Sequence, residues 1–134
     1  MEHADRASAP ATVDDPVGLA ADLIENARTL VRRGWCQGTC ARDDRGAPVV
    51  PWSGSAAAWS AMGALTKEWY EKVEQGAVEW SVALTAFRYA GVALAEAVAV
   101  GPQTWNDDED RTSREVIAAL EHAARTVRAR SGTP

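Results

Sequence analysis

The sequence has little cysteine, little histidine and no excess of positive charge, and each shortage excludes a class of protein. Its 134 residues include only two cysteines and two histidines, whereas structural zinc sites usually need four such ligands. The net charge is −5, whereas nucleic-acid-binding proteins usually carry a clustered basic excess. The sequence also has no phosphate-binding glycine loop. We therefore expect no metal ion, no cofactor and no nucleic-acid partner.

A long uncharged hydrophobic segment is also missing. The longest apolar run, residues 82–100, is rich in alanine and contains Arg88 and Glu96, so we expect no membrane span. These two charges either face solvent or are buried with partners. Residues 1–15 are polar and acidic, which is typical of a disordered leader and not of a secretory signal. We therefore expect a cytoplasmic protein whose cysteines stay reduced.

Residues 16–130 have the hydrophobic pattern of a single helical domain. The first helix is predicted over residues 16–33, because apolar side chains recur there at helical spacing. Asp14 or Asp15 can cap its start, and Gly34 is expected to end it in a left-handed conformation.

Two further helices are predicted in the middle of the chain. Ser53 or Ser55 can cap the first of them, and Gly76 either ends it or lies within one bent helix that continues into the next segment. The next, about residues 77–100, stops at Gly101. Because this helix is apolar nearly all round, we expect it to be the central helix of the domain.

The last helix begins with a capping-box pattern, in which Thr112 precedes Glu115 by three residues, and is expected to end at Gly132. The polar connection TWNDDEDRTSRE leads into it. The predicted fold is therefore all-α, a small bundle of about four helices. A long ordered loop, or at most one short β-ribbon, connects the first helix to the second.

The loop after the first helix contains the unusual stretch RRGWCQGTCARDDRG, residues 32–46. Its cysteines, Cys36 and Cys40, have three residues between them, and a lone pair at this spacing is a weak metal or redox signal. We interpret them as partly buried free thiols. The residues Asp43 to Gly46 form a turn signal, whose two arms either pair as a hairpin or lie across the helices.

Six tryptophans are present, and several of them stand beside polar residues of the two loops. Tryptophan can fill volume between alanine-rich helices, or it can line a pocket for a ligand. If a pocket forms, polar groups beside the rings would orient its ligand. The candidate ligand-binding residues are Trp35, Gln37, Arg42, Asp43, Trp59, Arg88, Trp105 and Asn106.

Three segments, RRGWCQGTCARDDRGAPV, AAAWSAMGAL and TWNDDEDRTSREVIAALEHA, occur in this order along the chain. They resemble a group of short proteins of actinobacteria and their phages, the DUF6197 family of unknown function. The resemblance implies no activity. It implies that the loop from Gly34 to Gly46 and the turn Trp105–Asn106–Asp107 form one unit, and side chains of such a turn can bond the backbone of a buried loop.

Two functions remain open from the sequence. The first is a non-catalytic ligand-binding or protein-interaction module with a regulatory or accessory role, because no complete catalytic set is present. The second is a small cofactor-independent enzyme, a cyclase, isomerase or hydrolase that acts on a hydrophobic specialised metabolite between tryptophan walls. Asp43 or Asp107 would then be its acid or base. The expected partner is a small hydrophobic molecule or a protein, and a homodimer through the alanine-rich helices fits either function.

Overall fold

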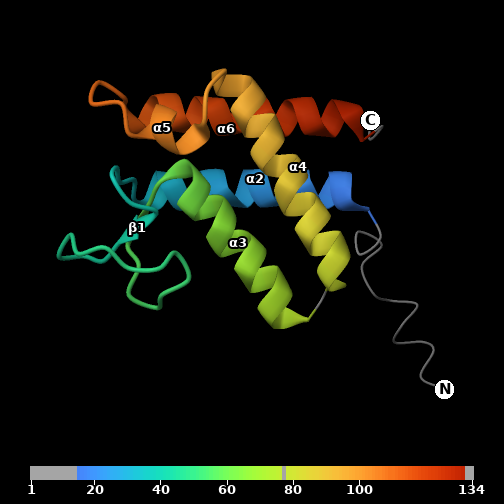
Figure 1. The fold of residues 1–134 in the computed structure, drawn as a ribbon, viewed down its shortest axis with the longest axis horizontal. Helices are drawn as coiled ribbons and strands as arrows, with labels where there is room; N and C mark the ends of the chain where they lie inside the picture. The colour runs from blue at the N-terminus through green and yellow to red at the C-terminus, as the bar shows by residue number, and fades with distance from the viewer. Residues whose placement is uncertain (1–14, 77, 132–134) are drawn as a thin grey trace.

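The computed structural model describes residues 15–76 and 78–131 (Figure 1). Of the expected leader, only Asp15 belongs to these residues, and Gly132, where the last helix was expected to end, lies outside them. In chain order the elements are α2 (Pro16–Arg33), β1 (Ala41–Arg42), β2 (Ala58–Trp59), α3 (Ala61–Gln75), α4 (Trp80–Val98), α5 (Pro102–Asn106) and α6 (Ser113–Arg130). The predicted fold class, a helical bundle with a short ribbon between its first two helices, is confirmed. The described part has five helices because the polar connection contains the one-turn helix α5.

Helix α2 lies at the centre of the bundle and packs against α3, α4 and α6. It starts as predicted: the Asp15 side chain accepts a hydrogen bond from Gly18 N–H at 3.0 Å, and Pro16 occupies the first turn. Its buried face includes large residues such as Leu23 and Ile24, both fully buried. The prediction that the most apolar helix is central is therefore wrong, because α2 and not α4 occupies that place.

Helix α4 contributes mainly small side chains to the core. Four of its five buried residues are alanines, and Leu94 is the fifth. Alanines allow close approach to α2, but they bury only a narrow strip of the helix, so apolar residues such as Val92 remain exposed. By length and composition α4 could cross a membrane, a test that core helices of soluble proteins also pass.

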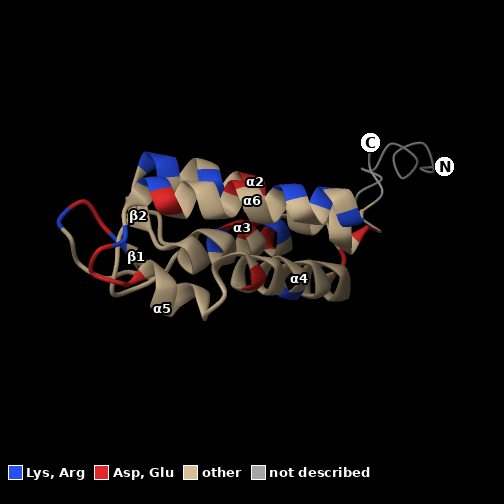
Figure 2. Ribbon diagram, turned by 90° about the horizontal axis from the view of Figure 1, so that it is seen from above, with Lys and Arg blue, Asp and Glu red and all other residues tan. Residues whose placement is uncertain are grey.

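Helices α2 and α6 lie side by side and antiparallel (Figure 1). The predicted capping box at the start of α6 is confirmed, since Thr112 accepts from the Glu115 N–H and the Glu115 side chain accepts from the Thr112 N–H. Seen from above, α2 and α6 form one layer and α3 and α4 the other (Figure 2). Charged residues are frequent on the first layer and sparse on α4 and α5.

The loop between α2 and α3 contains a two-stranded antiparallel ribbon, in which Ala41 pairs with Trp59 and Arg42 with Ala58. This pairing takes Ala58 and Trp59 out of the helix predicted for that segment. Helix α3 therefore starts later than predicted, with Ser60 as its N-cap, and the expected caps Ser53 and Ser55 are wrong.

Two glycines allow the loop to lie against the helices. Gly34 is extended rather than left-handed, which corrects the expected helix end. A side chain at Gly34 would lie 2.1 Å from the Ala57 carbonyl oxygen. A side chain at Gly63, in α3, would lie 1.9 Å from the Cys40 carbonyl oxygen. Glycine is needed at both positions because the backbone approaches so closely.

Candidate functional site

The side chain of Asn106, fully buried at the end of α5, joins three segments of the chain. Its Oδ1 accepts hydrogen bonds from Trp35 Nε1 at 2.9 Å and from the Ala61 N–H at 3.0 Å. Its Nδ2 donates to the Cys36 carbonyl at 3.1 Å. One amide therefore holds the loop, the start of α3 and the end of α5 together.

Two more side chains connect the loop to the residues that follow α5. Gln37 Nε2 donates to the carbonyls of Asn106 at 3.0 Å and Asp108 at 2.7 Å. The Gly38 N–H donates to Asp107 Oδ1 at 2.9 Å. The loop and the Trp105–Asn106–Asp107 turn therefore form one unit, as the family resemblance implied.

Gln103 extends these contacts from α5 to α3. Its Nε2 donates to both carboxylate oxygens of Asp107 at 3.1 Å, and its Oε1 accepts from Ser60 Oγ at 3.0 Å. Ser60 Oγ in turn accepts from the Gly63 N–H at 3.0 Å. We call this set the Asn106 network; its side chains are those of Trp35, Gln37, Ser60, Gln103, Asn106 and Asp107.

Asp107 is held in its ionised form. Burial alone would raise the pKa of its carboxyl group, but hydrogen bonds from Gly38, Asn106 and Gln103 outweigh burial, and the nearby Arg42 adds to their effect. Its pKa is therefore lower than usual. A general acid at neutral pH needs a raised pKa, so this carboxylate is suited to structure rather than to proton donation.

Arg42 and Asp43 both bind the backbone of the turn. Arg42 donates to the carbonyls of Gln37 at 2.9 Å and Gly46 at 3.0 Å. Asp43 Oδ1 accepts from the N–H groups of Arg45 and Ala47, each at 2.9 Å. The polar atoms of these two candidate site residues are thus engaged in shaping the loop.

The three tryptophans proposed for a ligand site have separate surroundings. Trp35 donates to Asn106, and the buried Trp59 donates from Nε1 to the Pro51 carbonyl at 3.0 Å. The Trp105 ring lies 4.0 Å below the guanidinium of Arg111. None of the three lines either of the pockets described below.

The other three tryptophans connect neighbouring elements. Trp69 of α3 packs against Trp80 and Phe87 of α4, with ring centroids 5.6 and 5.3 Å apart. Trp52 stacks on Tyr70 at 4.6 Å. Trp69 is partly buried and fills space beside α4, as one interpretation of the sequence predicted, whereas Trp52 and Trp80 are 41% and 53% exposed.

Both cysteines are free thiols, as predicted. Burial raises the pKa of Cys36, and Cys40 and Asp107 add to this effect while Arg42 opposes it. A thiol with a raised pKa stays protonated and is a poor nucleophile at neutral pH. Among the described residues no group of three or more histidine, cysteine or acidic side chains could hold a metal ion.

An apolar groove of about 570 Å³ lies beside α4, between this helix and α5. We call it the α4 groove; it is lined by Met62, Arg88, Gly91, Val92, Ala95, Gly101, Pro102, Gln103 and Thr104. The amide of Gln103 does not face the groove for binding, because it is hydrogen-bonded within the Asn106 network. A side chain at Gly91 would meet no atom within 4 Å. Arg88 therefore supplies the only charge of the lining. The Asn106 network positions α5 and so forms one wall of this groove.

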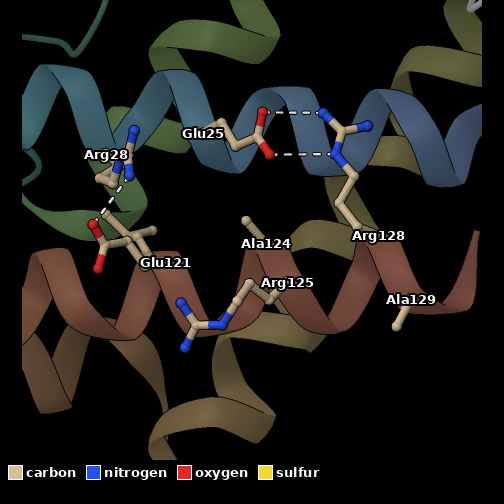
Figure 3. Close-up of a pocket in the computed structure, with 8 residues that line it drawn as sticks. Glu25, Arg28, Glu121, Ala124, Arg125, Arg128 and Ala129 are labelled. Carbon is tan, nitrogen blue, oxygen red and sulfur yellow. Dashed lines mark hydrogen bonds and ion pairs between the residues drawn. The ribbon is translucent and has the colours of Figure 1, made fainter. Parts of the chain in front are cut away.

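A second pocket of about 500 Å³ lies between α2 and α6 (Figure 3). Ion pairs occur at both ends of it: Arg28 with Glu121 at 3.0 Å, and Arg128 with Glu25 at 3.0 Å. These ion pairs join the two helices, while Arg125, which also lines the pocket, has no ion pair among the described residues.

The structure brings together half of the eight predicted ligand-binding residues. Trp35, Gln37, Arg42 and Asn106 lie in or beside the Asn106 network, whereas Arg88 lies apart, exposed at the edge of the α4 groove. Sequence reasoning missed Ser60 and Gln103 in the network, and it missed the apolar lining of the groove. The sequence did contain one signal for the groove: α4 is apolar but carries its charges, Arg88 and Glu96, on one face only.

Fold and site together define a small helical domain in which the signature residues brace a loop against a one-turn helix. A comparison with protein families agrees: the profile of the Family of unknown function (DUF6197) matches residues 15–126. The chain belongs to this family. No curated protein and no solved structure matches it.

Proposed function

We propose that this protein is a non-catalytic protein-interaction module with an accessory or regulatory role, and that its partner docks in the α4 groove. The observation that carries this proposal is the uncovered apolar surface of α4. Val92, at the edge of the groove, is 56% exposed, and Val100 just beyond the helix is 51% exposed. An apolar hollow rimmed by polar residues is typical of a protein-binding surface.

The occupant of the groove is an apolar helix that carries a carboxylate. Helices commonly bind other proteins by laying an apolar face into such a groove. Arg88 has no ion pair or hydrogen bond within the described part of the chain. A carboxylate on the partner would complement it.

Two other readings receive less support. The candidate acid/base residues Asp43 and Asp107 both use their carboxylates to hold backbone groups, and the pKa of Asp107 is lowered. A membrane-bound α4 would have to bury Arg88 and Glu96, which are both exposed on its outer surface.

The test is site-specific photocrosslinking in the host that encodes the protein. A photoreactive phenylalanine analogue replaces Val92, and in a control variant it replaces Ala118, which is exposed on α6. We expect a covalent adduct with one polypeptide from position 92 only, and we expect Arg88→Glu to reduce its yield severalfold. Equal yields at both positions, or no dependence on Arg88, would contradict the proposal. An adduct with a small molecule would contradict a protein partner and would show that the groove binds a hydrophobic ligand.

A further inference from the structure

The outer face of α4 is complementary to itself. After Trp80, its exposed residues recur at every third or fourth position, and we call this set the α4 outer face: Ser81, Thr85, Arg88, Val92 and Glu96. Val92 stands at the middle of the charged part. Arg88 precedes it by four residues and Glu96 follows it by four. The face thus presents a cation, an apolar residue and an anion in a symmetric order.

This order matches the symmetry of the commonest protein dimers. In a two-fold contact, each surface residue i of one copy meets residue j of the other, and j meets i. When two α4 helices pair antiparallel about an axis at Val92, Arg88 of each copy meets Glu96 of the other. The two Val92 side chains then meet at the axis. A single helix face supplies both ion pairs.

The charges of the outer face are available for such a contact. Arg88 has no ion pair within the described residues. Glu96 pairs with Arg130 at 3.4 Å, and both side chains are about half exposed, so this contact is loose. Few other charges lie on this side of the molecule (Figure 2).

We infer that the partner helix is α4 of a second copy, and that the protein forms a two-fold dimer with Val92 at its axis. This inference rests on the proposed function, because the α4 outer face shares Arg88 and Val92 with the α4 groove. The dimer covers Val92, which is the apolar residue of the α4 outer face. It also gives Arg88 and Val92 one shared role.

Charge reversal provides a direct experiment. In a homodimer of R88E, two carboxylates would face each other at each of the two charged contacts. In a homodimer of E96K, two cations would do so. A mixture of the two variants restores opposite charges in both pairs. Association is measured by sedimentation velocity and native mass spectrometry, and circular dichroism confirms that each variant is folded.

We expect the wild type to be dimeric and each variant alone to associate at least about tenfold more weakly. The mixture should form a heterodimer with an affinity near that of the wild type. The matched controls R114E and E109K make the same changes of net charge at exposed positions away from α4. Both should remain dimeric.

Several results would overturn the inference: a monomeric wild type, full dimerisation of R88E alone, or a mixture that stays monomeric. Flotation of the wild type with phosphatidylglycerol vesicles, lost in Val92→Glu, would assign the face to a membrane instead. If the protein does not dimerise but position 92 crosslinks to a different polypeptide, the inference fails and the proposed function stands. A failed dimer without any such crosslink would remove both.

Discussion

The loop end of the molecule and the outer face of α4 use their residues in opposite ways. In the Asn106 network the polar atoms are matched with one another, so its unusual residues are occupied within the monomer. On α4, Val92 remains uncovered and Arg88 unpaired among the described residues. The comparison teaches that conspicuous sequence features can serve the fold, while a plain alanine-rich helix carries the free surface.

The largest effect on stability is expected at the centre of the loop end. Asn106→Ala leaves Trp35 Nε1, the Ala61 N–H and the Cys36 carbonyl without their partner in a buried place. We expect the free energy of unfolding in urea to fall by about 3 kcal/mol or more. The control Gln75→Ala changes an exposed residue. A loss below about 1 kcal/mol for Asn106→Ala would show that the network is not the main brace.

The next largest difference between the two regions is expected from the same substitution, glycine to alanine, made once in each region. A methyl group at Gly63 would lie 1.9 Å from the Cys40 carbonyl oxygen, whereas nothing lies within 4 Å of the corresponding position at Gly91. We expect Gly63→Ala to lower the free energy of unfolding by about 2 kcal/mol or more. Gly91→Ala should raise it by about 0.5–1 kcal/mol, because alanine favours helix.

Both glycine variants are best compared by thermal unfolding on an Arg88→Glu background, where self-association plays no part. Equal changes in the two melting temperatures would mean that the close approach of the loop to α3 is easily relieved.

The third prediction concerns pH. The pKa of Asp107 is lowered in the folded protein, so its ionised form stabilises the fold. This contribution is present above the ordinary pKa of 3.8 and is lost as the pH falls through the lower folded value. Asp107→Asn should therefore be less stable at pH 7 and lose less stability on acidification.

Urea unfolding at several pH values between about 2 and 7 measures this difference. Glu109→Gln is the control, because it removes an exposed carboxylate from the same connection. Parallel pH profiles for Asp107→Asn and the wild type would contradict the assigned role of the carboxylate.

The smallest effect on the monomer is expected on the α4 outer face. Val92→Ser changes a side chain that is 56% exposed, so the free energy of unfolding, extrapolated to low protein concentration, should stay within about 0.5 kcal/mol. The same change should weaken self-association. A large loss of monomer stability would show that Val92 belongs to the core.

Local signals in the sequence predicted most helix boundaries. Asp15 with Pro16, and Thr112 with Glu115, define helix starts through contacts within one turn. The start of α3 was mispredicted because Ser53, Ser55 and Ser60 are locally equivalent caps. The pairing of β2 with β1, some 17 residues earlier in the chain, decides among them.

The candidate site was only partly predictable. The sequence and the family resemblance pointed to Trp35, Gln37 and Asn106. These residues were selected because polar side chains stand beside tryptophans in the two loops. Their partner Gln103 could not be found, since the contact of its amide with Ser60 depends on how α5 docks. The exposure of α4 could not be found either, because an apolar helix is usually buried.

The hydrogen bond from Trp35 to Asn106 also has a consequence for the order of folding events. It closes a separation of 71 residues, so the bond can form only after the chain between these residues has been compacted. The loop is therefore expected to gain its final shape late, after α2 and α3 have formed. Because the indole of Trp35 enters this bond, its fluorescence in refolding should report the last step of assembly rather than the first.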